Sequence, residues 1–150
     1  MSIYILKKAA VVTAVAASLS LASQVTAESY NPYPGKLPAN LVNVVSPATV
    51  EVEAETWPGY SRNFRVSLPS IEVPNLNAPQ PCQRKLAEKA LSFTKKFLTD
   101  AASISISALE MSNSADQTVI GQIDTNQGSL LDALKNNGFA RLADNDEPWC

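Results

Sequence analysis

The fold is decided by residues 49–68, which read Thr49-Val-Glu-Val-Glu-Ala-Glu-Thr-Trp-Pro-Gly-Tyr60-Ser-Arg-Asn-Phe-Arg-Val-Ser-Leu68. After Thr49, residues 50–55 alternate between apolar side chains and glutamates, and this period of two predicts a strand over 49–55 with one buried face. The turn-forming residues Trp57-Pro-Gly-Tyr60 end that strand, and residues 64–68 supply the next one. Metal binding is the alternative interpretation of the alternating glutamates, but a solvated strand face is favoured: Glu51, Glu53 and Glu55.

Further elements are predicted on both sides of this stretch. Upstream, a short apolar run ends at Ser46-Pro47; downstream, four prolines in residues 69–82 predict a long loop. Apolar side chains at three- and four-residue spacing then predict a helix, and a second helix begins with Ser129 and Asp132 in a capping box and stops before Gly138. The predicted strands are 41–45, 49–55, 64–68, 103–107 and 118–123, and the predicted helices are 83–100 and 129–137.

The order of these elements is three strands, a helix, two strands and a helix. Five short strands with a helix after the third predict a five-stranded, OB-fold-like Greek-key barrel. The expected fold class is therefore α+β, with two to three helices packed on the barrel.

The first 27 residues have the pattern of a cleavable signal peptide. Lys7 and Lys8 precede an apolar run over residues 9–22, and Val25-Thr-Ala27 resembles a cleavage site. A membrane anchor is the alternative, but a spanning helix needs about 20 apolar residues. We therefore expect cleavage before Glu28, an irregular leader over 28–40, one domain over 41–150, and a periplasmic or secreted protein without a membrane span.

The composition restricts the chemistry. The chain has no histidine, which removes the commonest general base and every Ser/His or Cys/His catalytic arrangement. Loss of residues 1–27 takes away two of the 12 basic residues and none of the 14 acidic ones, so the net charge falls from −2 to −4. An acidic chain has no long-range attraction for nucleic acid. The basic residues of the first predicted helix are interpreted as a solvated face rather than a binding patch: Arg84, Lys85, Lys89, Lys95 and Lys96.

The two cysteines, Cys82 and Cys150, predict a disulfide, because an even number of cysteines in an exported chain is typical of a bridge. The bridge would tie residues 144–150 back to the start of the first helix. A zinc site is the alternative, but two cysteines without histidine do not supply four protein ligands of the usual kind. No cofactor is expected.

Three stretches together resemble the thermonuclease, or staphylococcal-nuclease-like, family over nearly the whole predicted domain. Residues 90–97 resemble the family's first helix, residues 129–140 resemble its second helix, and residues 64–68 with 71–74 resemble a barrel strand and the loop after it. The resemblance implies calcium-dependent cleavage of phosphodiesters. In that chemistry two aspartates hold the ion, a glutamate activates water, and two arginines hold the phosphate.

Only part of this machinery carries over to the chain. Arg65 matches the arginine of the barrel strand, and Glu72 stands where the second metal aspartate is expected, as a weak candidate metal ligand. The other positions depart from the family pattern: Ala48 replaces the first metal aspartate, Val73 replaces a threonine, Asn75 replaces the general base, and Gln117 or Thr118 replaces the second arginine.

We therefore expect an exported domain that has lost phosphodiesterase activity and acts as a binding or structural module. Its partner is expected to be an unknown protein or a weakly bound nucleic acid, and Arg65 is expected either to contact phosphate or to pair with Glu72 or Glu51. The alternative is an active calcium-dependent nuclease with a rearranged site, in which Glu51, Glu72 and Asp116 replace the lost ligands.

Overall fold

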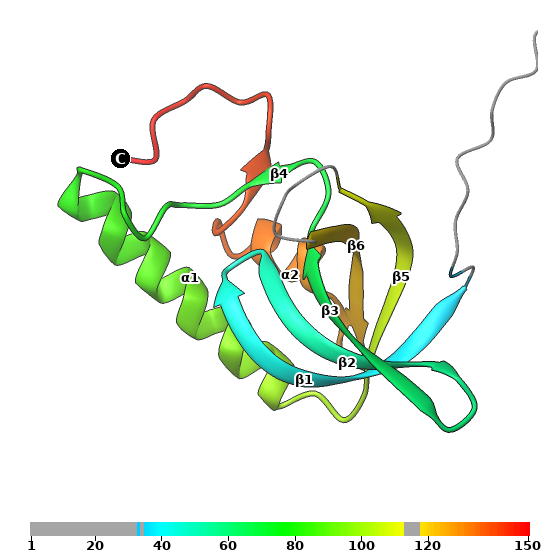
Figure 1. The fold of residues 1–150 in the computed structure, drawn as a ribbon. Coiled ribbons are helices and arrows are strands. Elements are labelled where there is room, and N and C mark those ends of the chain that lie inside the picture. The colour runs from blue at the N-terminus through cyan, green and yellow to red at the C-terminus, as the bar shows by residue number, and fades with distance from the viewer. Residues whose placement is uncertain (1–32, 34, 113–117) are drawn as a thin grey trace, which may run out of the picture.

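A computed structural model describes residue 33 and residues 35–112 and 118–150 of the 150-residue chain. Figure 1 shows the chain path through these residues. The expected signal peptide, residues 28–32 and 34 of the expected leader, Asp116 and Gln117 lie outside the described residues.

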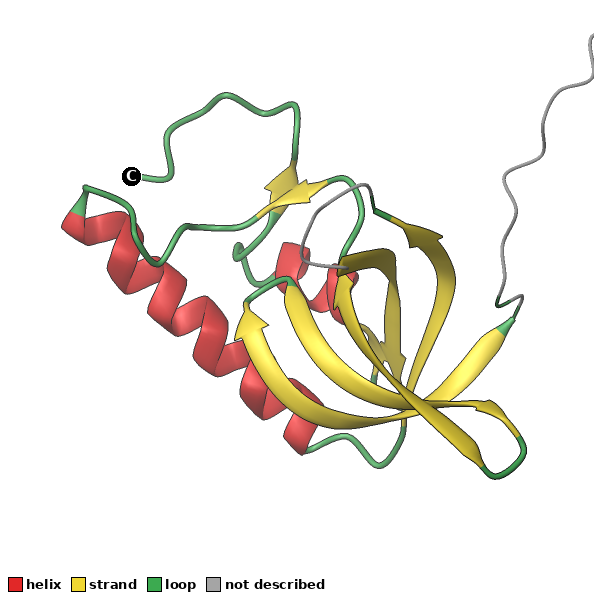
Figure 2. Ribbon diagram, in the orientation of Figure 1, coloured by secondary structure: helices red, strands yellow, loops and turns green. Residues whose placement is uncertain are grey.

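Five strands form a closed barrel, which confirms the predicted OB-fold-like architecture (Figure 2). They run in the order β3-β2-β1-β5-β6, and β6 pairs back onto β3. The β3–β6 pairing is parallel, and the others are antiparallel. The barrel strands are β1 (Lys36–Ser46), β2 (Thr49–Trp57), β3 (Tyr60–Ser67), β5 (Ile104–Met111) and β6 (Thr118–Thr125).

Two helices pack on the barrel, as predicted. Helix α1 (Pro81–Thr99) lies beside β1, and the short helix α2 (Leu130–Asn136) packs against β6 and α1 (Figure 1). The Ser129 hydroxyl accepts a hydrogen bond of 3.4 Å from the Asp132 backbone N–H, which confirms the predicted cap at the start of α2. Gly138 follows α2 with φ of 72°, a left-handed conformation that glycine adopts without strain.

All five barrel strands are longer than predicted, and β1 and β3 begin several residues early. β1 begins at Lys36, so the expectation of an irregular leader is wrong for residues 36–40. The proline in this segment, Pro38, lies before β2 pairing begins at Ala39, where β1 has a partner on one side only and a strand tolerates proline. β3 begins at Tyr60 rather than at residue 64, because the arm of the β2–β3 hairpin is exposed on both faces and carries no alternation.

Three two-residue strands complete the structure, and none was predicted. Strand β7 (Gly128–Ser129) pairs with the end of β6. Strand β4 (Ile71–Glu72) lies in the predicted loop and pairs with β8 (Arg141–Leu142), so the C-terminal segment returns to the chain just after β3.

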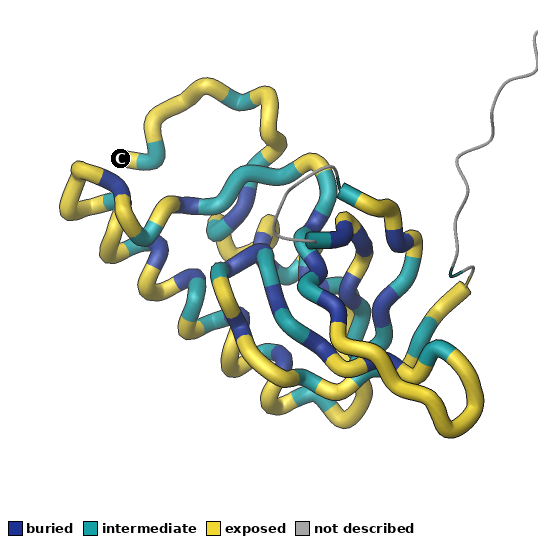
Figure 3. The backbone as a smooth tube through the Cα atoms, viewed as in Figure 1, coloured by how far each residue is buried: buried dark blue, intermediate teal, exposed yellow. Residues whose placement is uncertain are grey.

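The core fills the barrel and extends to the helices (Figure 3). Val50, Val52 and Ala54 of β2 are buried, which confirms the predicted inward face of the alternating strand. Thr94 of α1 is the one buried polar side chain among the described residues. Among the helices in the described part of the chain, none has the length and apolar character to cross a membrane.

Candidate functional site

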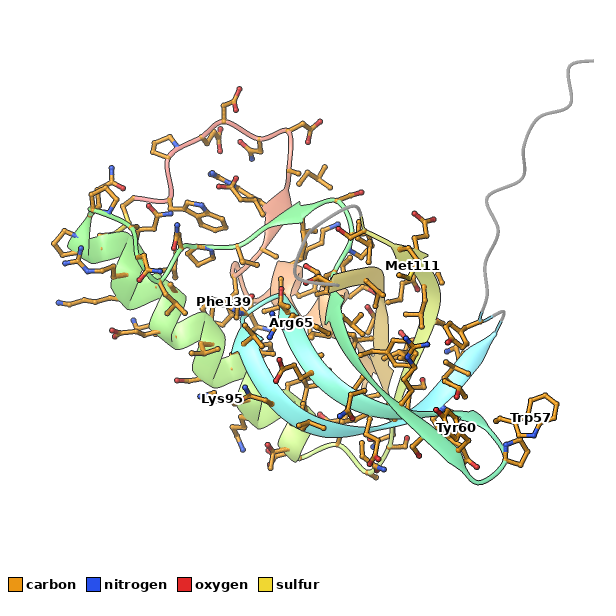
Figure 4. All side chains as sticks on the ribbon, in the orientation of Figure 1. Trp57, Tyr60, Arg65, Lys95, Met111 and Phe139 are labelled. Atoms are coloured by element: carbon orange, nitrogen blue, oxygen red, sulfur yellow. A yellow bond between two sulfur atoms is a disulfide. The ribbon has the colours of Figure 1, made fainter. Side chains whose placement is uncertain are left out.

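A row of polar side chains runs across the wall of the barrel over four neighbouring strands. Asn43 of β1 pairs in register with Glu51 of β2, Glu51 with Arg65 of β3, and Arg65 with Thr118 of β6. The residues adjacent to Glu51 and Arg65 in sequence are buried inside the barrel, so alternation turns these two side chains outward. We call these four residues the polar row; Figure 4 labels Arg65 within it.

Arg65 and Glu51 form an ion pair at the centre of the polar row. The Arg65 Nη2 and Nε atoms donate hydrogen bonds of 2.7 and 3.1 Å to the same oxygen, Oε1 of Glu51. Asn43 donates a longer bond of 3.4 Å to Oε2. The hydrogen bond from Arg65, with smaller contributions from Asn43 and from the charge of Arg65, lowers the pKa of Glu51 below its ordinary value of 4.5, although desolvation opposes the shift. Glu51 is therefore a carboxylate at neutral pH and offsets the charge of Arg65.

Glu72 pairs with Arg141 of the C-terminal segment, not with Arg65. Nε and Nη2 of Arg141 donate hydrogen bonds of 3.0 and 2.9 Å to Oε2 of Glu72, and Nε1 of Trp149 donates one of 3.4 Å to Oε1. The Arg141 guanidinium also lies 4.2 Å from the centroid of the Trp149 ring, a cation–π contact, and donates to the Glu147 carbonyl. Both oxygens of the candidate metal ligand are thus engaged by the protein itself.

Ala48, at the position expected for the first metal ligand, is buried in the turn between β1 and β2. Its carbonyl accepts a 2.9 Å hydrogen bond from the Leu68 N–H, and the neighbouring Pro47 carbonyl accepts one of 2.8 Å from the Thr94 hydroxyl. The turn is therefore held by α1 and by the residue that follows β3, and the methyl group of Ala48 offers no oxygen to an ion.

The remaining departures from the family pattern have structural roles. Val73 packs against the core, and Thr118 begins β6 opposite Arg65. Asn75 is exposed, and its side-chain oxygen accepts a 2.8 Å hydrogen bond from the Asn77 N–H, a local turn contact. Neither an amide nor a hydroxyl supplies the proton acceptor or the guanidinium that phosphodiester cleavage requires.

These positions do not fit a calcium ion. Within residues 35–112 and 118–150, histidine, cysteine, aspartate and glutamate side chains nowhere gather in a group of three that could hold a metal. Of the carboxylates proposed for a rearranged site, Glu51 and Glu72 pair with different arginines, and Asp116 lies outside the described residues.

Cys82 and Cys150 form the predicted disulfide, with a Cα–Cα distance of 6.3 Å. This excludes the zinc alternative, because both thiols are consumed. The bond joins the first turn of α1 to the C-terminal segment, as expected. The basic side chains of α1 are exposed, as either a solvated face or a binding patch requires, and Lys96 pairs with Asp100 at 2.6 Å.

The pairing of Glu72 with Arg141 and Trp149 was not predicted. The only signal for it was the expected disulfide, which brings residues 144–150 back toward the start of α1. A comparison with protein-family models and a comparison with curated proteins both find no match for this chain. Membership of the thermonuclease family therefore stays a prediction.

Proposed function

We propose that this protein is an exported, nuclease-like module without phosphodiesterase activity, which binds another protein or, weakly, a nucleic acid. The observation that carries the proposal is the internal pairing of both charged residues that match the family pattern. Arg65 pairs with Glu51, and Glu72 pairs with Arg141.

Internal pairing opposes catalysis at the step where charge develops. A phosphate approaching Arg65 competes with a carboxylate that already accepts two hydrogen bonds from the guanidinium. The side chains at Ala48 and Asn75 supply neither a metal ligand nor a base. Loss of one member of a catalytic group typically costs orders of magnitude in rate, so the combined loss removes the family reaction.

A protein partner is favoured over nucleic acid by charge and by exposed aromatic side chains. The polar row contains the carboxylate of Glu51, and Glu53 and Glu55 of the same strand, β2, face solvent. Trp57 and Tyr60 are 74% and 65% exposed at the tip of the β2–β3 hairpin, which projects away from the barrel (Figure 4). Tryptophan and tyrosine are the side chains that most often anchor protein interfaces.

The hairpin tip is held in shape before any partner arrives. The Gly59 N–H donates a 2.9 Å hydrogen bond to the Glu55 carboxylate, and the Thr56 hydroxyl donates one of 3.3 Å to the Tyr60 carbonyl. Gly59 also adopts φ of 79°, which suits glycine. Binding through a pre-organised tip avoids much of the entropy cost of ordering a loop.

Export to the periplasm or to the medium is supported by two observations. The disulfide between Cys82 and Cys150 is a bond that persists in oxidising compartments. Residues 1–27, outside the described structure, have the signal-peptide pattern.

One observation favours the second candidate, a calcium-dependent nuclease with a rearranged site. Asp116 precedes Thr118 by two residues, and Thr118 lies opposite Arg65 across the β3–β6 pairing. This candidate requires Asp116, which lies outside the described residues, to act together with Glu51.

A calcium titration separates the two candidates. The melting temperature of the oxidised protein is measured in a chelator and in rising calcium, for the wild type and for Glu51→Gln. A ligand that binds only the folded state raises the melting temperature, so the non-catalytic module shows no saturable rise. A saturable rise that Glu51→Gln abolishes would support the rearranged nuclease instead.

A further inference from the structure

A hollow of about 500 Å³ lies where the first turns of α1 meet the C-terminal segment. None of its lining residues belongs to the polar row. We call it the disulfide pocket, and its lining residues are Cys82, Lys85, Leu86, Lys89, Trp149 and Cys150. Small-molecule sites typically occupy roughly 300–1,000 Å³ and combine an apolar wall with a few polar groups.

The apolar wall of the disulfide pocket is fixed by the contacts of Trp149. Arg141 lies over the indole ring and is not among the residues that line the pocket, and Nε1 donates a hydrogen bond to Glu72. The disulfide holds the next residue, Cys150, against α1. Because the ring is positioned in advance, a ligand that packs on it bears little ordering cost.

Two lysines, Lys85 and Lys89, line the disulfide pocket. Lys85 and Lys89 are four residues apart on α1, so their side chains are neighbours on one helix surface. Neither side chain has an ion pair or a hydrogen bond within the described part of the chain. Like charges at this spacing repel each other, and an anion between them would relieve the repulsion. The first turn of α1 contains no acidic residue that would pair with these lysines.

We propose that the disulfide pocket binds a small organic anion. Its flat aromatic or hydrocarbon group packs on Trp149, Leu86 and the disulfide, and its carboxylate lies between the ammonium groups of Lys85 and Lys89. This site does not depend on the proposed function, because it shares no residue with the barrel wall.

The two tryptophans of the chain allow a direct test by nuclear magnetic resonance. Their indole N–H signals are assigned with Trp57→Phe, and 2-naphthoate is titrated into the oxidised protein. We expect a saturable shift of the Trp149 signal and no comparable shift of Trp57, which lies at the hairpin tip. A shift of equal size at both indoles would overturn the proposal, since it indicates nonspecific contact.

Matched ligands and variants test each part of the site. In Lys85→Met/Lys89→Met the aliphatic stems remain, and loss of two exposed charge contacts should weaken 2-naphthoate binding about tenfold. The charge-matched control, Lys95→Met/Lys135→Met, should bind as the wild type does. The neutral 2-naphthylmethanol should bind more weakly than 2-naphthoate, and inorganic phosphate should give no saturable shift at Trp149. Equal binding of the alcohol, a saturable shift with phosphate, or unchanged binding in the Lys85/Lys89 double variant would each overturn the proposal.

Discussion

The hydroxyl of Thr94 donates a 2.8 Å hydrogen bond to the carbonyl oxygen of Pro47, which joins the middle of α1 to the turn between β1 and β2. Thr94 is fully buried, and the contact spans 47 residues of sequence. The turn that it holds carries Ala48, so the same bond that fixes the helix on the barrel also fixes the position where the family pattern expects a metal ligand.

Replacement of Thr94 by valine should destabilise the protein. The two side chains have nearly the same shape, but valine cannot donate, so the buried Pro47 carbonyl loses its partner at a cost of about 1–3 kcal/mol. Urea unfolding gives this difference, and Thr94→Ser, which retains the hydroxyl, should lose less. A Thr94→Val variant as stable as the wild type would show that the bond does not contribute.

Gly121→Ala should also lower the free energy of unfolding, because Gly121 lies where β6 passes close to its neighbours. An added Cβ would stand 2.6 Å from Leu109 Cδ2, 3.2 Å from the Ser107 carbonyl oxygen and 3.3 Å from Val66 Cγ1. Overpacking of this kind costs about 1–3 kcal/mol.

A double-mutant cycle with Leu109→Ala isolates the closest of these contacts. The penalty of Gly121→Ala, measured by urea unfolding, should be smaller in the Leu109→Ala background. An equal penalty in both backgrounds would place the strain elsewhere.

Arg141→Met should loosen the C-terminal segment. The variant keeps an aliphatic side chain but loses both hydrogen bonds to Glu72 and the cation beside Trp149. We expect a loss of about 1–2 kcal/mol and stronger quenching of Trp149 fluorescence by iodide, measured in a Trp57→Phe background. Arg141→Lys retains the charge without the forked geometry, so its stability and its quenching should fall between those of the wild type and Arg141→Met. Unchanged quenching in Arg141→Met would mean that the disulfide alone holds the tryptophan.

The ion pair between Glu51 and Arg65 should make stability depend on pH in the acid range. Arg65 lowers the pKa of Glu51 in the folded protein, so the pair stabilises the fold above pH 4.5 and this contribution is lost as the pH falls through the lowered pKa. The measurement is the difference in urea midpoint between the wild type and Glu51→Gln, from neutral pH to about pH 3. This difference should shrink on acidification.

Glu53→Gln is the matched control for that experiment. Glu53 faces solvent on the same strand, without an ion pair in the described part of the chain. A difference for Glu51→Gln that stays constant with pH, or one that Glu53→Gln reproduces, would contradict the assigned pairing.

The barrel was predictable because its strands have one face in the core. Val50, Val52 and Ala54 alternate with outward glutamates, and the period of two reports burial directly. The arm of β3 from Tyr60 to Asn63 was missed, since it projects beyond the core and burial imposes no pattern on it.

The partner of Arg65 was left open between Glu51 and Glu72, and the reason is a register shift. Trp57 pairs with Tyr60 across the turn, and regular pairing from there would place Glu51 opposite Val66. An irregularity between Glu55 and Trp57 moves the register by one residue, so Glu51 lies opposite Arg65 instead. Nothing in the sequence marks this shift.

The contact of Glu72 with Arg141 could not be predicted from local sequence, because 69 residues separate the two side chains. It depends on the two-residue pairing of β4 with β8 and on the disulfide at the end of the segment. Strands this short have no periodicity to detect.

A turnover assay tests the central claim, the absence of phosphodiesterase activity, most directly. Purified, oxidised protein is incubated with single- and double-stranded DNA and RNA, in calcium and in a chelator, with Arg65→Ala in parallel. We expect every substrate to remain intact under all conditions. Calcium-dependent cleavage by the wild type that disappears in Arg65→Ala would contradict the account and show that the barrel carries a working site.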